Sequence, residues 1–277
     1  MVVSLFLQRQ LPRLALSTLV FSSSLLPRTF PARSIRTIMS TTIPEAYAPA
    51  PKGITLYTLG TPNGVKISVA LSVLGVPYKS YLIDISTNIQ KEPWFLEHVN
   101  PNGRIPGIID TTEGKPVRVF ESGAILIYLA DKYDKNYKIS YPHGTPEYYE
   151  TLEWLFFQNA GVGPMQGQAN HFKVFAPEKI PYGIKRYTDE TRRLYSVLET
   201  RLKDNKSGFL VGDHVSIADF STVGWVAGSY SLEIDLKSEF PELHAWVERI
   251  IKLPGAVEGF NTPSPWRGFT TGPWKAE

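Results

Sequence analysis

The pattern of apolar residues changes once along this chain, near residue 145, and this change constrains the fold more than any other feature. From 54 to 133, short strand-like runs alternate with helical runs in the order β-α-β, then β-β-α. From Thr145 onward the pattern is helical only, with amphipathic segments at about 147–172, 180–204, 216–230 and 239–253. The sequence therefore predicts an α+β chain, with a small α/β domain followed by an all-helical domain.

Proline, glycine and polar clusters mark the expected domain boundaries. We expect the first domain over residues 53–135, a linker over 136–146 and the helical domain over 147–265. Residues 1–44 are expected to be a leader and residues 266–277 a C-terminal tail.

The leader differs in charge from the rest of the chain. Residues 1–44 contain five arginines and no lysine, aspartate or glutamate. Without them the chain has 24 basic and 26 acidic residues, so its basic pI is no argument for a nucleic-acid partner, and none is expected. An arginine- and serine-rich segment without acids is typical of a mitochondrial transit peptide. A secretory signal is the competing interpretation, because residues 14–26 are apolar, but three of the arginines follow that stretch.

The apolar part of the leader is too short for stable membrane insertion. Serines at 22–24 interrupt it and Pro27 ends it, whereas a membrane-spanning helix needs roughly 20 apolar residues. Met39 could serve as an internal start, which would give a cytoplasmic form of the same protein alongside the mitochondrial one.

The absence of cysteine limits the chemistry. It excludes disulfides, thiolate metal sites and a cysteine nucleophile, so any thiol must come from a substrate. The five histidines lack the spacing of metal ligands, and no metal is expected.

The segment Thr61-Pro62-Asn63-Gly64 is the most informative motif for function. Thr61 is a good N-cap, Pro62 suits the first position of a helix, and Asn63 would project its amide from the first turn. A helix N-terminus favours an anion. For the tetrapeptide alone, a capped helix without a ligand is an equal alternative.

Two further elements are expected at the same edge of the first domain. Pro106 begins a strand and is expected to follow a cis bond, which would let Ile105 offer its N–H and C=O to an extended peptide. Ser122 caps the next helix and suits a carboxylate, while Glu121 can accept from an ammonium group. Together these elements describe a site for an amino-acid end, a peptide bond and an anion.

From residue 53 to 265 the chain resembles the glutathione transferases. Within that family it is most similar to the branch of the fungal nitrogen-regulating prion proteins and the bacterial nu-class disulfide-bond reductases. The resemblance implies a thioredoxin-like N-terminal domain followed by an all-helical C-terminal domain. Five motifs in family order carry it, at residues 61–66, 100–106, 121–125, 161–165 and 184–187.

The resemblance also implies roles in holding glutathione for residues of four of these motifs. Glu121 and Ser122 would bind the γ-glutamyl group, and the backbone of Ile105 would bind the cysteinyl amide. Asn63, with Thr61, would face the sulfur as the catalytic pair.

Three basic residues and one glutamine complete this scheme. Gln90 or Lys91, together with Arg104, would line the glycyl end of glutathione. Arg186 would reach the same pocket from the helical domain. For Arg104 and Arg186, a solvated surface charge is an equal alternative.

The expected arrangement is strong enough to ionise a thiol. Lowering a thiol pKa from about 8.5 by two units requires on the order of 2.7 kcal/mol. A helix N-terminus supplies up to about 2 kcal/mol and a hydrogen bond to a charged sulfur about 1.5–3 kcal/mol, so no general base is needed. Tyr57 is the rival activator, but its position inside a predicted strand favours packing.

We therefore expect a glutathione-dependent transferase or disulfide-bond reductase, with peroxidase activity as a further option. Its partners would be glutathione and a small electrophile or disulfide, and the resemblance implies a homodimer. The alternative is a non-catalytic glutathione-binding regulatory protein on the same fold. The chain lacks the Asn/Gln-rich extension of the nitrogen-regulating relatives, which weakens that alternative.

Overall fold

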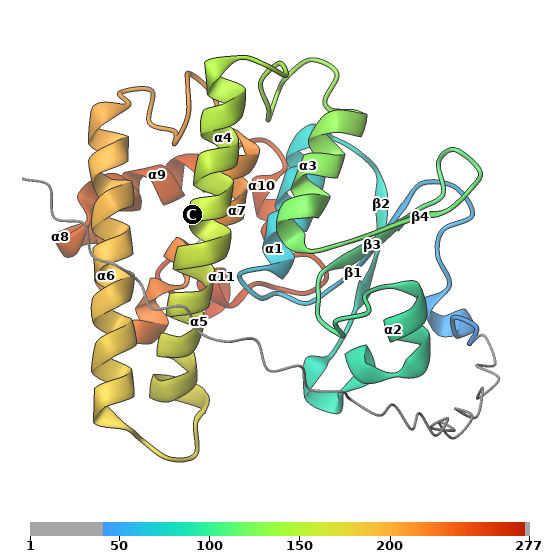
Figure 1. Cartoon of the computed structure of the whole chain (residues 1–277), viewed down its shortest axis with the longest axis horizontal. Coiled ribbons are helices and arrows are strands. Elements are labelled where there is room, and N and C mark those ends of the chain that lie inside the picture. Colours follow the sequence, from blue (N-terminus) through green and yellow to red (C-terminus); the bar gives the residue numbers. More distant parts are fainter. Residues whose placement is uncertain (1–40, 275–277) are drawn as a thin grey trace, which may run out of the picture. The chain divides into compact units, whose positions relative to one another are not determined.

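The first part of the structure is a four-stranded sheet. We analysed a computed structural model that describes residues 41–274, so most of the predicted leader, with Met39, and the last three residues lie outside the described residues. The strands are β1 (Ile54–Thr58), β2 (Tyr78–Leu82), β3 (Gly107–Asp110) and β4 (Val117–Phe120), in the order β2-β1-β3-β4 (Figure 1). β1 is parallel to β2, and β3 is antiparallel to both β1 and β4. The predicted α+β class is confirmed.

Alternating residues of β1 pack on the two faces of this sheet. Ile54 and Leu56 belong to the large core that includes α1 (Gly64–Leu74) and α3 (Ser122–Tyr133). Tyr57 belongs to a second cluster with Trp94 and Phe95 of α2 (Pro93–His98). Figure 1 shows α1 and α3 on one side of the sheet and α2 on the other. Because side chains alternate along a strand, β1 is buried on both faces.

Helix α1 starts later than the sequence predicted. It begins at Gly64 instead of Pro62, after a tight turn in which the Oγ1 of Thr61 accepts from the Gly64 N–H at 3.1 Å. A Cβ at Gly64 would lie 1.9 Å from the carbonyl oxygen of Leu59, so only glycine allows the chain to turn back so closely on the end of β1. The helix ends at Gly75, whose φ of 75° gives the predicted left-handed cap.

Short turns and loops connect these elements. α3 has the predicted bounds, and the helical turn predicted around Trp94 is α2. The remaining short turns of this part are the 3-10 turns η1 (Glu45–Tyr47), η2 (Ile85–Thr87) and η3 (Ile89–Lys91).

The second part of the described chain is helical, as predicted. The expected segment at 147–172 is one run of α4 (Pro146–Phe157), the π turn η4 (Gln158–Val162), α5 (Gly163–Asn170) and the π turn η5 (His171–Phe175). The next three expected segments correspond to α6 (Pro181–Asp204), α7 (Ile217–Ala227) and α9 (Pro241–Ile251). Shorter elements complete it: η6 (Ser229–Leu232), α8 (Leu236–Glu239), α10 (Ala256–Phe260) and α11 (Arg267–Thr270). No helix within residues 41–274 is both long and apolar enough to cross a membrane.

A buried capping box begins α7. The Oδ2 of Asp219 accepts from the Ser216 N–H at 2.8 Å, and its Oδ1 accepts from the indole of Trp246 at 2.8 Å. Burial raises the pKa of Asp219, although these hydrogen bonds oppose the rise. The capping box is therefore a folding element of the helical part.

Helix α7 packs against the turn that precedes α1. A Cβ at Gly224 would lie 2.7 Å from the carbonyl oxygen of Pro62, so the two segments are in direct contact. Residues 266–274, which were expected as part of a tail, include α11 and pack on the end of α7. There the indole of Trp274 donates to the Ala227 carbonyl at 2.7 Å. Helix α7 therefore contacts and supports the Thr61–Asn63 turn.

Candidate functional site

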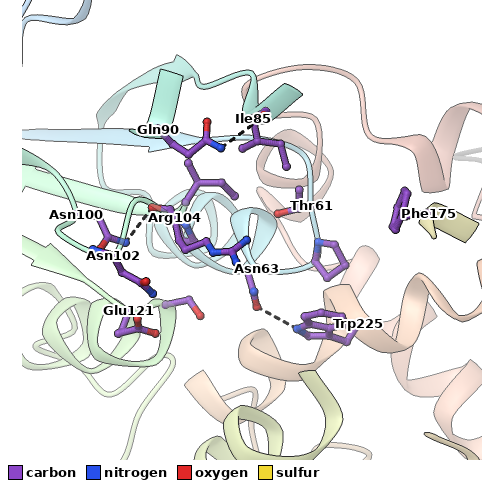
Figure 2. Close-up of a pocket in the computed structure, with 14 residues that line it drawn as sticks. Thr61, Asn63, Ile85, Gln90, Asn100, Asn102, Arg104, Glu121, Phe175 and Trp225 are labelled. Atoms are coloured by element: carbon purple, nitrogen blue, oxygen red, sulfur yellow. Dashed lines mark hydrogen bonds between the residues drawn. The ribbon is translucent and has the colours of Figure 1, made fainter. Parts of the chain in front are cut away.

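A cleft of about 610 Å³ lies where the α1 turn, the loop before β3 and the start of α3 meet (Figure 2). It brings together seven of the nine site residues predicted from the sequence, namely Thr61, Asn63, Gln90, Arg104, Ile105, Glu121 and Ser122. The other lining residues are Pro62, Ile85, Asn100, Asn102, Pro106, Phe175 and Trp225.

Asn63 is held in the cleft by a residue of the helical part. The indole Nε1 of Trp225 donates to Oδ1 of Asn63 at 3.1 Å, and Figure 2 shows the two side chains meeting at the floor of the cleft. Because an indole N–H can only donate, the bonded atom of Asn63 must be its oxygen. The amide nitrogen of Asn63 is then the end that remains for a ligand.

Trp225 is itself firmly fixed. Its ring lies within 3.5 Å of the Cβ position at Gly167, and its carbonyl accepts from the Gln166 amide at 2.7 Å. The residue is 8% exposed. Asn63 is therefore bonded to a rigid support.

Thr61 is also occupied as an acceptor. Its Oγ1 accepts from the Gly64 N–H at the start of α1, so its own O–H is free to donate into the cleft. Thr61 and Asn63 thus present two donors beside a helix N-terminus, an arrangement that favours a negatively charged ligand atom.

A hydrogen-bonded loop presents the backbone of Ile105. The side chain of Asn100 donates to the Arg104 carbonyl at 2.9 Å and accepts from the Asn102 N–H at 2.9 Å. The Ile105–Pro106 bond is cis, as predicted. Pairing of β3 with β1 begins only at Gly107, so the strand pairing leaves the peptide groups of Ile105 available to an extended ligand.

The start of α3 supplies an acid and a hydroxyl. Glu121 is exposed and has a φ of 68°, which is unfavourable for any residue other than glycine. Ser122 is 8% exposed and is the first residue of α3, so its N–H points out of the helix end. An ammonium group can bind Glu121 while a carboxylate binds at Ser122.

A buried lysine lies behind Ser122. The Nζ of Lys66 donates to the Ser122 Oγ at 3.2 Å and to Oε1 of Gln158, in the π turn η4, at 2.7 Å. Burial lowers the pKa of Lys66 to about 7, and the charge of Glu121 opposes this by a smaller amount.

Gln90 offers a spare acceptor at the other end of the cleft. It is 7% exposed, and its Nε2 donates to the Ile85 carbonyl at 3.3 Å. Its Oε1 is buried and has no hydrogen-bond partner within residues 41–274. A buried acceptor of this kind suits an N–H group of a ligand.

The other two predicted site residues do not line this cleft. Lys91 is exposed and donates to the Asn102 carbonyl at 3.2 Å, so it supports the loop from outside. Arg186 lies on the exposed side of α6 and lines a separate hollow with Tyr182 and Glu190. The buried face of α6 carries other residues, Thr191, Leu194 and Leu198 among them, which turns Arg186 away from the core.

Tyr57 lies outside the cleft as well. It is fully buried, its hydroxyl donates to the Tyr47 carbonyl at 2.8 Å, and burial raises its pKa. It packs in the cluster under α2, in agreement with its predicted role.

Sequence reasoning missed Lys66, Gln158, Trp225 and Phe175. A signal existed for Lys66, because a lysine within an apolar helix that is buried all round needs a specific partner. Trp225 was not recognisable, since its partner Asn63 is 162 residues away. Among residues 41–274, no group of three or more histidine or acidic side chains is arranged to hold a metal ion.

Two family models match the chain. The N-terminal domain model of glutathione S-transferase matches residues 52–131, and the C-terminal domain model matches residues 184–254.

Individual relatives agree with these matches. The chain is 43% identical over 204 residues to the disulfide-bond oxidoreductase YfcG of Escherichia coli, covering 73% of this chain and 91% of the relative. It is 39% identical over 216 residues to glutathione S-transferase 1 of Schizosaccharomyces pombe, covering 73% of this chain and 93% of the relative. It is 32% identical over 240 residues to protein URE2 of Eremothecium gossypii, covering 75% of this chain and 67% of the relative.

A solved structure is similar over the same region. It is a glutathione transferase homologue from Lodderomyces elongisporus, crystallised with two glutathione molecules per subunit. The two chains are 50% identical, with a TM-score of 0.74, and the match covers 76% of this chain and 99% of the other.

Proposed function

Since this chain belongs to the glutathione S-transferase family, we propose that its cleft binds glutathione and that Asn63 and the start of α1 keep the glutathione sulfur ionised. The hydrogen bond from Trp225 to Asn63 carries this proposal, because it leaves the Asn63 amide as a donor. The Thr61 hydroxyl is the second donor. A sulfur at this point meets two N–H or O–H groups and a helix N-terminus.

The rest of glutathione extends along the cleft. Its α-ammonium binds Glu121 and its α-carboxylate binds at Ser122, where the helix end favours an anion. The cysteinyl amide pairs with the backbone of Ile105. The glycyl end lies near Gln90 and Arg104, where Oε1 of Gln90 lacks a partner and Arg104 is positively charged.

The bound thiolate is the nucleophile. With an electrophile, the sulfur forms a bond to carbon and the leaving group departs with the bonding electrons. With a glutathionylated mixed disulfide, the sulfur attacks the glutathione sulfur, glutathione disulfide forms, and the other thiolate leaves and takes up a proton. The exposed Phe175 at the rim of the cleft offers an apolar surface to the second substrate.

Asn63→Ala tests this function. A hydrogen bond to a charged group is worth about 1.5–3 kcal/mol, so the pKa of the bound thiol is expected to rise by about 1–2 units. Ultraviolet titration of the glutathione complex measures that pKa. For a wild-type thiol pKa of about 6.5, turnover at pH 7 is expected to fall by roughly 3- to 25-fold with a chlorinated aromatic electrophile or a hydroxyethyl mixed disulfide. An organic hydroperoxide is assayed as the third substrate.

Tyr57→Phe is the matched control, because it removes a buried hydroxyl from the opposite face of β1. It is expected to change neither the thiol pKa nor turnover. A larger loss of turnover in Tyr57→Phe than in Asn63→Ala would refute the assignment of Asn63 as the residue that stabilises the thiolate. A bound thiol no more acidic than free glutathione would refute it as well.

The similarity to URE2 favours one alternative, a regulatory protein that binds glutathione without significant catalysis. Both functions predict retention on immobilised glutathione. Turnover separates them, since tight binding with no activity toward any of the three substrates would favour the regulator.

Location and assembly are further parts of the proposal. We propose that the acid-free leader directs import into mitochondria, and N-terminal sequencing of mitochondrial and cytosolic fractions tests this and the use of Met39.

We also propose a homodimer. Tyr149 and Phe156, two turns apart on α4, are both more than half exposed, which supports a buried partner face there. Light scattering of the purified chain tests it.

A further inference from the structure

Lys66 is a buried charged residue to which the proposed function assigns no role. It is 1% exposed, within a helix whose other residues are mostly apolar. Its two hydrogen-bond partners, Ser122 and Gln158, are both neutral. No carboxylate among the described residues forms an ion pair with it. A buried ammonium group without a counter-charge is costly, and this cost normally requires a compensating anion.

The elements around Lys66 bring few other charges near it. Glu121, at the start of α3, is the one charged group whose field reaches it, and this residue is exposed. α1 has no second charged residue, and the π turn η4 has none. Most charged groups of the neighbouring helices are engaged elsewhere: Asp219 of α7 with Ser216 and Trp246, and Asp131 and Lys132 of α3 with His143 and Asp110. Glu258 of α10, which also packs on α1, is exposed to solvent.

From this geometry, and resting on the proposed function, we propose that Lys66 is the counter-charge for the α-carboxylate of the γ-glutamyl group, and that a γ-glutamyl ligand therefore takes up a proton as it binds. The Ser122 Oγ accepts from Lys66 and can donate its own proton to the carboxylate. One hydroxyl thus separates the two charges. Neither the ammonium nor the carboxylate then lacks an opposite charge.

The size of the effect follows from this spacing. With 3.2 Å from Nζ to Oγ and a second hydrogen bond of ordinary length, the charges lie about 6 Å apart. At an effective dielectric constant of about 20, the carboxylate favours protonated Lys66 by up to roughly 100-fold, since the ligand's own ammonium, paired with Glu121, opposes part of this effect. Lys66 with a pKa of about 7 in the free protein would then take up as much as about 0.8 proton at pH 8 and no more than about 0.1 at pH 6.

Calorimetry with S-hexylglutathione tests the proposal. Its sulfur is blocked, so no thiol proton is released. The full chain is titrated in phosphate and in Tris at pH 7 and 8, and in phosphate and in MES at pH 6, and the different ionisation enthalpies of the two buffers give the number of protons taken up. The wild-type protein is expected to show the rise in uptake with pH. Uptake below about 0.2 proton at pH 8 would overturn the role of Lys66.

Lys66→Met gives a second, pH-dependent readout. Methionine fills similar space without charge. The affinity of the variant protein for S-hexylglutathione is expected to fall by about 100-fold at pH 6 but only about 10-fold at pH 8. A merely structural lysine would instead give the same loss at both values. Lys138→Met is the matched control, because Lys138 bonds the Val73 carbonyl at the far end of α1. It is expected to leave proton uptake unchanged.

A ligand variant keeps the test valid if Lys66→Met does not fold. The analogue 4-aminobutyryl-S-hexylcysteinylglycine lacks only the α-carboxylate, and the wild-type protein is expected to bind it without proton uptake. Equal uptake with both ligands would refute the proposal while leaving the proposed function intact. If neither glutathione nor S-hexylglutathione binds, the proposed function fails and this inference fails with it.

Discussion

Replacing Trp225 by phenylalanine removes one N–H group and keeps most of the aromatic packing. The lost group is the donor that holds Oδ1 of Asn63 at 3.1 Å. The Trp225 carbonyl would still accept from Gln166 and Tyr195, so the surrounding hydrogen bonds of the helical part remain. Without the indole N–H, the Asn63 amide can rotate and present its oxygen to the sulfur.

The expected loss of thiolate stabilisation equals the free energy of one neutral hydrogen bond. About 1 kcal/mol corresponds to about 0.7 pKa unit, or about fivefold in the thiolate fraction below the pKa. Trp225→Phe is thus expected to raise the pKa of the bound glutathione thiol by less than Asn63→Ala does. From a starting pKa of about 6.5, the thiolate fraction and turnover should fall about twofold at pH 7 and approach a fivefold loss at about pH 5.5 and below, and raising the pH should restore turnover.

Ultraviolet titration of the glutathione complex and the pH profile of turnover measure these two quantities. Trp274→Phe is the matched control, because it also removes a buried indole hydrogen bond, to the Ala227 carbonyl, away from Asn63. It is expected to lower the melting temperature without changing the thiol pKa. A thiol pKa that is unchanged in Trp225→Phe but raised in Asn63→Ala would refute the idea that Trp225 orients Asn63.

Two other substitutions test the energetics of the site and the fold. Glu121→Gly is expected to raise stability by about 1 kcal/mol in thermal unfolding, because the φ of 68° suits glycine, and to weaken glutathione binding because the ammonium partner is lost. An unchanged or lower melting temperature would show that the backbone at Glu121 is not strained. Burial alone would raise the pKa of Asp110, but hydrogen bonds from Thr112 and two tyrosines lower it overall. Its stabilising effect is therefore present above the unfolded pKa of about 3.9 and is lost as the pH falls through the folded pKa. Asp110→Asn should cost about 2 kcal/mol in urea unfolding at pH 7, and the difference should shrink below about pH 4. A difference that does not depend on pH would contradict this.

Local signals in the sequence predicted the parts of the fold that depend on local physics. The bounds of α3 follow from an amphipathic run, and the end of α1 follows from a glycine in the left-handed conformation. The prediction that Ser122 caps α3 was wrong, because Glu121 is the N-cap, without a side-chain hydrogen bond, and the Ser122 hydroxyl accepts from Lys66. The start of α1 was misplaced because it depends on how closely the chain approaches the carbonyl of Leu59. That approach is a property of the folded structure and leaves no local pattern.

The candidate site divides in the same way. Residues next to helix starts and the cis-proline were predictable, since capping and proline chemistry are local, and the structure gathers them in one cleft with Gln90 and Arg104, which only the family resemblance had placed there. The supports of the site were not predictable. Trp225 reaches Asn63 from 162 positions away, and Gln158 reaches Lys66 from 92 positions away. Arg186 shows the converse, because a charged residue on a long helix can face several directions and only packing decides which.

The long-range contacts decide the chemistry because they determine which atoms remain for a ligand. Asn63, Thr61 and Ser122 each carry a group that can donate or accept, and each is occupied as an acceptor by a protein donor: an indole N–H, a backbone N–H and an ammonium group. An acceptor so occupied leaves its own proton for the ligand. The cleft therefore presents donors at two places, beside the N-termini of α1 and α3. A ligand that has an anion at both places, such as a thiolate and an α-carboxylate, matches this polarity, whereas a ligand that lacks an anion at either place does not.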